Sequence, residues 1–168
     1  MRIKAISHLG FNCKDLDKSI AFYRDIMGCT EKFAMTYGDL ADNLAEDYAK
    51  QGKKEPFYVK AMRRFADTKW AVYMQWTENS FIELFYLMGA HKRRIPGKKD
   101  LNYTHYSLEV DDIRGFRQQI IDKGAAEYLD SEITIGVDHT LQFWMHDPDG
   151  NPFEIMEYTP TSMQLVGR

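Results

Sequence analysis

The chain has 168 residues and a net charge of −3, and 44% of its residues are hydrophobic. This length allows one domain or two small modules with a core, and the mild charge argues against a nucleic-acid partner. The two cysteines, Cys13 and Cys29, are too few for a disulfide framework, which predicts a cytoplasmic location. No apolar run approaches the roughly 20 residues of a membrane span, so we expect no membrane partner.

The first half, residues 1–90, begins with a predicted strand at 3–13 that leads into a helix. Asp15 and Asp17 are candidate N-caps of this helix, and Gly28 ends it. Further strands are expected at 29–37, 69–76 and 81–87, and residues 57–65 fit either a strand or a helix.

Residues 38–62 are expected to form a helical insertion within this half. Leu40, Leu44 and Tyr48 fall four residues apart, which predicts an amphipathic helix. We expect the insertion to form a lid or a dimer contact over a hydrophobic substrate. The alternative is that it packs on the outside of the sheet.

A basic linker at 91–101 precedes a second module at 102–158. The elements expected in this module are a strand at 103–110, a helix that begins at Asp111-Asp112 and ends near Gly124, short strands near 127–129 and 133–137, and a hairpin over 141–158. Residues 159–168 are predicted to be a polar tail.

The two halves repeat one plan, with a histidine in the first strand and a glutamate in the last strand. His8 aligns with His105, and Glu83 aligns with Glu154. Each glutamate stands between two apolar residues, and a carboxylate is costly to bury there unless it is paired. Glu154 therefore faces either a metal ion or, in the simpler alternative, solvent at the rim of the sheet.

A family resemblance is carried by the strand of His105 and by three stretches, His8–Phe11, Ser19–Tyr23 and Asp147–Glu154. Together they resemble the vicinal oxygen chelate superfamily of glyoxalases, bleomycin resistance proteins and extradiol dioxygenases. The resemblance implies an α+β fold in which two βαβββ modules form a curved mixed sheet around a metal cavity. It also implies a small-molecule substrate and a homodimer, with modules that pair within a chain or between chains.

The resemblance further implies that His8, Glu83, His105 and Glu154 bind a divalent metal, as in the glyoxalase I (lactoylglutathione lyase) branch. Two imidazoles and two carboxylates suit Ni, Co, Zn, Mn or Fe. The implied reaction is that of a lyase or isomerase, in which the metal chelates two adjacent oxygens and stabilises an enediolate. Glu154 would then move a proton next to a carbonyl, with Glu83 as a ligand or second base.

Two positions depart from the glyoxalase I pattern. Asn12 stands where that branch has an arginine for the glutathione carboxylate, and Leu87 stands where it has an asparagine. Since arginine binds carboxylates better than asparagine does, we expect a more hydrophobic substrate than a glutathione adduct.

Three alternative functions fit the same residues. One is a metal-free small-molecule binding or resistance protein, another is an iron-dependent extradiol-type dioxygenase, and the third is an epimerase of the same superfamily. The aromatic lining expected for the binding protein is Tyr73, Trp76, Phe85, Phe143 and Trp144.

Two further histidines are alternative metal ligands. His146 is expected to help cap the turn at Asp147–Gly150, and His139 is expected to be exposed in a loop. Cys13 is expected to be a small hydrophobic residue, not a nucleophile.

Overall fold

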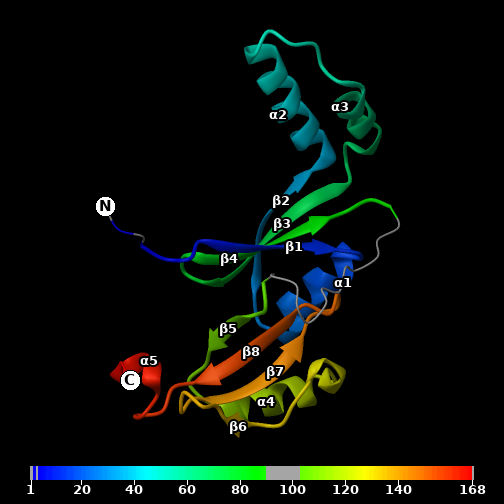
Figure 1. Ribbon diagram of the computed structural model, residues 1–168. Coiled ribbons are helices and arrows are strands. Elements are labelled where there is room, and N and C mark those ends of the chain that lie inside the picture. Colours follow the sequence, from blue (N-terminus) through cyan, green and yellow to red (C-terminus); the bar gives the residue numbers. More distant parts are fainter. Residues whose placement is uncertain (1, 3, 90–102, 168) are drawn as a thin grey trace. The chain divides into compact units, whose positions relative to one another are not determined.

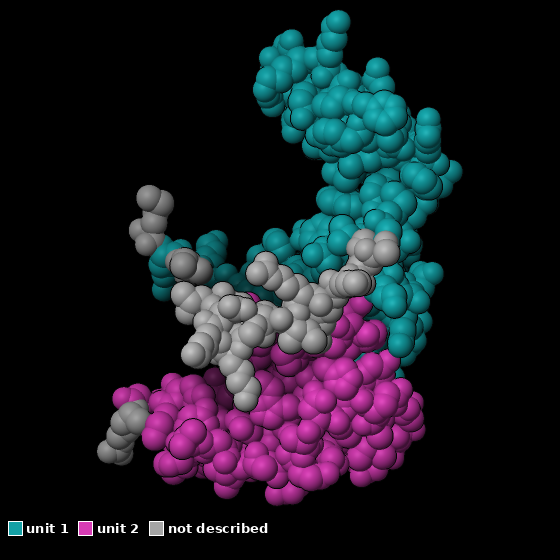
Figure 2. Space-filling view, turned by 45° about the vertical axis from the view of Figure 1, so that its right-hand side comes forward, with its two compact units in different colours: residues 1–91 teal, residues 92–168 magenta. Residues whose placement is uncertain are grey.

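The chain divides into two compact units, residues 1–91 and 92–168 (Figures 1 and 2). The structure is a computed structural model that describes residues 2, 4–89 and 103–167. The basic linker predicted at 91–101 lies outside the described residues.

Unit 1 contains a four-stranded mixed sheet with the strand order β1-β4-β3-β2. Its elements are β1 (His8–Cys13), α1 (Leu16–Ala21), the π-helical turn η1 (Phe22–Ile26), β2 (Thr30–Thr36), β3 (Lys69–Thr77) and β4 (Ser80–Tyr86). Strands β1 and β4 are parallel, whereas β4, β3 and β2 are antiparallel neighbours.

Unit 2 has the same topology, with the strand order β5-β8-β7-β6 and β5 parallel to β8. Its elements are β5 (Tyr106–Glu109), α4 (Ile113–Asp122), the 3-10 turn η3 (Ala126–Tyr128), β6 (Thr134–Ile135), β7 (Leu141–His146), β8 (Pro152–Glu157) and α5 (Met163–Val166). The predicted α+β class with two βαβββ modules is confirmed, and each module forms an open sheet of its own.

The first helix of each unit begins and ends as its sequence predicts. Asp15 Oδ1 accepts a hydrogen bond from Lys18 N at 3.0 Å, and Asp112 Oδ1 accepts one from Gly115 N at 2.9 Å. Each aspartate therefore satisfies a backbone donor that the first helical turn leaves without a partner.

After these helices the chain turns at Gly28 and Gly124, whose φ angles are +78° and +72°. Glycine adopts this left-handed conformation without steric cost.

The core of each unit lies on the helix-covered face of its sheet, where α1 packs on β4 and α4 packs on β8. The fully buried strand residues on this face are Val72, Met74, Ile82 and Leu84 in unit 1, and Phe143, Met145, Phe153 and Ile155 in unit 2. Burying one such side chain stabilises the fold by about 1.5–3 kcal/mol.

Two segments of the second unit differ from their predictions. Near 127–129 only Leu129 is bridged, antiparallel to Met145, because Tyr128 N and Leu129 N donate to the carbonyls of Ala125 and Ala126 and close a 3-10 turn. Residues 159–168 are not simply a polar tail either, since α5 lies within them and Met163 N donates to Asp138 O at 2.8 Å.

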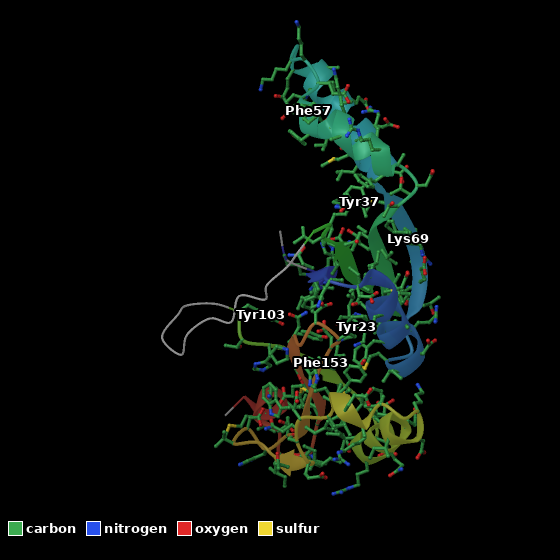
Figure 3. The ribbon with its side chains drawn as sticks, turned by 90° about the vertical axis from the view of Figure 1, so that its right-hand side faces the viewer. Tyr23, Tyr37, Phe57, Lys69, Tyr103 and Phe153 are labelled. Carbon is green, nitrogen blue, oxygen red and sulfur yellow. The ribbon has the colours of Figure 1, made fainter. Side chains whose placement is uncertain are left out.

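Between β2 and β3 the chain forms a helical arm, which we define as residues 37–65. It consists of α2 (Tyr37–Lys50), α3 (Phe57–Met62) and the 3-10 turn η2 (Arg63–Phe65). The arm extends beyond the end of the sheet instead of lying on either face, with Tyr37 at its base and Phe57 far from the base (Figures 1 and 3). Among the described helices, including those of the arm, none is long and apolar enough to cross a membrane.

A reciprocal pair of hydrogen bonds fixes the start of the arm. Asp39 N donates to Thr36 Oγ1 at 3.1 Å, and Thr36 N donates to Asp39 Oδ2 at 2.7 Å. The bonds from Thr36, its backbone N–H above all, hold the pKa of the Asp39 carboxyl below its usual value. This carboxylate therefore contributes stability above the pKa of the unfolded chain, and the contribution is lost as pH falls through the lower folded value.

We expect Thr36→Ala to destabilise α2 by about 1 kcal/mol, because the first turn loses its cap. Amide hydrogen exchange at pH 7 should become about five-fold faster in α2, while amides of β4 keep their wild-type rates. Thr36→Ser retains the hydroxyl and is the matched control. Equal exchange rates in the alanine variant and the wild type would show that the cap does not stabilise the arm.

Candidate functional site

In unit 1, His8 and Glu83 lie on adjacent parallel strands and face the same side of the sheet. Glu83 is the register partner of Gly10, and His8 precedes Gly10 by two residues on the same face. The His8 Nε2 and Glu83 Oε2 atoms are 3.6 Å apart. The Glu83 side chain is 11% exposed and the His8 side chain is 44% exposed, so the pair combines a nearly buried acid with an accessible imidazole.

Tyr73 on β3 is the other register partner of Glu83. Burial above all, together with the hydrogen bond to the Glu83 carboxylate and its charge, raises the pKa of Tyr73 to about 12. The Tyr73 ring also meets the His8 ring edge-on, with centroids 5.8 Å apart. The phenol therefore supplies a donor to the buried Glu83 carboxylate, which offsets part of its desolvation cost.

Unit 2 places Glu154 at the equivalent position of its sheet, and His105 directly before β5. Glu154 is the register partner of Ser107 on β5 and of Trp144 on β7, and His105 precedes Ser107 by two residues. The His105 and Trp144 rings meet edge-on with centroids 4.6 Å apart. Each unit therefore presents one histidine and one glutamate on the sheet face opposite its core.

The two glutamates differ in their surroundings. Glu83 is buried and bound by Tyr73, whereas Glu154 is half-buried and its strand neighbour is the Trp144 ring. No hydrogen bond or ion pair to the Glu154 carboxylate occurs among residues 4–89 and 103–167. The Glu154 carboxylate thus keeps more of its acceptor capacity for a ligand.

The spacing of the His8 and Glu83 donor atoms suits one metal ion. Two ligand atoms that are each about 2.1 Å from an ion lie roughly 3.0–3.4 Å apart for octahedral or tetrahedral angles, close to the observed 3.6 Å. The described residues contain no cluster of three or more His, Cys, Asp or Glu side chains that could hold a metal. Each unit by itself therefore offers two ligands.

The structure gives the other two histidines different partners. The His146 Nδ1 atom lies 2.9 Å from Asp130 Oδ1, so the expected role of His146 as a turn cap is wrong. Asp147 holds that turn, since its Oδ1 accepts from Asp149 N at 3.0 Å and from Asn151 N at 2.8 Å. His139 is exposed, as predicted, and adopts a positive φ of 64°.

One predicted lining residue lies on the wrong face. Phe143 pairs with Ile155 on β8, and both are fully buried on the core side. Trp144, the next residue, pairs with Glu154 on the opposite face. The cysteines are buried and unbonded to each other, and burial raises the pKa of Cys29 to about 12, so its thiol is a poor nucleophile.

Sequence reasoning missed the role of Gly10. A Cβ atom there would lie 3.3 Å from the Phe85 ring and 3.8 Å from Glu83 Oε2, so glycine lets the Phe85 ring and the Glu83 carboxylate lie close to β1. The equivalent residue in unit 2 is Ser107. A small residue two positions after each histidine was the signal that could have revealed this feature.

Comparisons with known proteins agree with this arrangement. A model of the Glyoxalase/Bleomycin resistance protein/Dioxygenase superfamily matches residues 5–155. No curated protein matches the chain in sequence.

Several solved structures share the fold. A glyoxalase family protein from Enterococcus faecalis has a TM-score of 0.61 at 15% identity, over 94% of this chain and 100% of that chain. Lactoylglutathione lyase from Agrobacterium tumefaciens has a TM-score of 0.56 at 16% identity, over 94% and 96%. TioX from Micromonospora sp. ML1 has a TM-score of 0.57 at 10% identity, over 93% and 100%.

Adjacent residues on β4 should respond differently to substitution. In chelator-treated protein, Glu83→Gln should leave the free energy of unfolding unchanged or higher, because an amide is easier to bury than a carboxylate and still bonds Tyr73. Leu84→Ala should lower it by about 2–5 kcal/mol, since it removes a fully buried side chain. Urea denaturation measures both variants. An equally large loss in Glu83→Gln would make Glu83 a structural residue.

Proposed function

Because this chain belongs to the glyoxalase/bleomycin resistance protein/dioxygenase superfamily, we propose that it is a metal-dependent lyase or isomerase that transfers a proton next to a carbonyl. The observation that carries the proposal is the recurrence of one histidine and one glutamate at equivalent positions of both units, with each glutamate paired to the residue two positions after the histidine. A structural acid would have no reason to recur with a histidine at the same spacing.

His8, Glu83, His105 and Glu154 are the proposed ligands of one divalent ion. Their nitrogen and oxygen donors suit Ni, Co, Zn, Mn or Fe. Two carboxylates offset the charge of a divalent ion, which lowers the cost of removing all three charges from water. The proposal holds whether the two pairs come from one chain or from two chains of a dimer.

A bound divalent ion would supply Lewis-acid polarisation of a substrate carbonyl. Glu154 is the proposed base, since its carboxylate is half-buried and receives no bond from the described part of the chain. One Glu154 Oε atom accepts the proton from the hydroxyl-bearing carbon next to the carbonyl, and the same carboxyl delivers a proton to the former carbonyl carbon. The hydroxyl proton passes to the oxygen of that carbon, so the product is an isomer of the substrate. Glu83, which Tyr73 holds in place, remains a ligand, and no external oxidant or reductant is needed.

A metal-free binding protein is the second candidate. It is favoured by the aromatic ring beside each carboxylate, Tyr73 in unit 1 and Trp144 in unit 2. Purification of the chain with a stoichiometric organic ligand and no metal would support this candidate against the enzyme.

The first test is metal content combined with turnover. Wild-type protein that is loaded with a divalent metal and then exchanged into metal-free buffer should retain one ion per four-residue site. This protein should isomerise the hemithioacetal of methylglyoxal and 2-mercaptoethanol. Glu154→Gln should bind the ion more weakly and lose at least about 100-fold in turnover, which is the usual contribution of a general base.

Glu109→Gln is the matched control, because Glu109 is an exposed acid on the neighbouring strand β5. Turnover in D₂O should incorporate solvent deuterium at the reacting carbon, and turnover should persist without oxygen. An absolute requirement for oxygen would instead indicate a dioxygenase, and wild-type turnover in Glu154→Gln would remove Glu154 as the base.

A further inference from the structure

Four aromatic rings surround Glu83 on its face of the unit 1 sheet. Phe81 and Phe85 precede and follow Glu83 by two residues on β4, and Phe33 pairs with Tyr73 across β2 and β3. We call Phe33, Tyr73, Phe81 and Phe85 the aromatic platform. None of these residues belongs to the helix-side core.

The rings of the platform are ordered against one another. Phe33 and Tyr73 are stacked, with centroids 4.6 Å apart and an interplanar angle of 16°, while Tyr73 and Phe81 meet edge-on at 6.2 Å. Phe33 is 47% exposed. The exposed Phe33 ring is stacked on Tyr73, the strand neighbour of Glu83, so a ligand on the His8–Glu83 face would cover it.

The paired positions around the platform are mostly uncharged. They carry Gly10 and Asn12 on β1, and Thr30, Met35, Ala71 and Gln75 on β2 and β3. Lys69, which pairs with Thr36, forms an ion pair with Glu31 at 3.0 Å. This surface therefore suits an apolar group.

We propose that the aromatic platform binds a flat aromatic group of the substrate, whose two adjacent oxygens lie at His8 and Glu83. A ring stacked on Phe33 would bury its exposed face. The substrate class is therefore an aromatic α-hydroxyketone or a similar aryl compound with vicinal oxygens. The assignment of the oxygens rests on the proposed function, whereas stacking on the platform does not.

A matched pair of neutral probes tests this inference. 2-Hydroxyacetophenone and hydroxyacetone carry the same vicinal oxygens, and only the first has a ring. Titrations of the full chain followed by NMR, before and after chelator treatment, should show tighter binding of 2-hydroxyacetophenone in both states. Phe33→Leu retains apolar bulk but removes the ring, and it should weaken binding of 2-hydroxyacetophenone by about 2- to 10-fold without affecting hydroxyacetone.

Phe57→Leu is the control for the substitution, because Phe57 is 78% exposed on the helical arm, away from the platform. Equal affinities of the two probes, or equal effects of Phe33→Leu and Phe57→Leu, would overturn the inference. The inference would also be overturned if neither probe binds and Phe33→Leu changes the oligomeric state. That result would identify the platform as a contact between copies of the chain. Ring-dependent binding in a protein that holds no metal would refute the proposed enzyme and leave the platform intact.

Discussion

The alternation of side chains along a strand is the constraint on which the rest of this structure depends. In β4 and β8 it directs Leu84 and Ile155 to the helix-covered core and turns Glu83 and Glu154 to the opposite face. A register slip of one residue would bury both acids against the helices and expose the core. The packing that stabilises each unit therefore also fixes the position of its carboxylate.

The duplicated scaffold gives its two carboxylates different surroundings. Tyr73 donates to Glu83, while the equivalent Trp144 turns its ring toward His105 and leaves the Glu154 oxygens without a donor from the described residues. A carboxylate held by a hydrogen bond suits permanent ligation, and one without such a bond is more available for proton transfer. Paired acids in different environments often have distinct acid and base roles. In this chain the difference comes from one strand position, which holds Tyr73 in unit 1 and Trp144 in unit 2.

Local signals in the sequence predicted much of the fold and of the candidate site. The caps at Asp15 and Asp112 depend on neighbours within one helical turn, so their sequence context determines them. The bond between His146 and Asp130 joins residues 16 positions apart, and no short pattern reveals it. Phe143 was misassigned because the lining was chosen by residue type, although adjacent strand residues such as Phe143 and Trp144 face opposite sides.

The differences between the two units are concentrated in β2, β3 and the connection between them. On the side of Trp144 away from β8, unit 2 has Asp130 and Ser131, since Asp130 N donates to Trp144 O and Trp144 N donates to Ser131 Oγ. Among the described residues, no aromatic one there corresponds to Phe33. The helical arm lies in the same β2–β3 connection, where a longer loop costs little closure entropy. The strands that carry His8 and Glu83 are the β1–β4 pair, away from that edge. The β2 edge of the unit 1 sheet can therefore change what is bound, while the β1–β4 pair preserves the proposed chemistry.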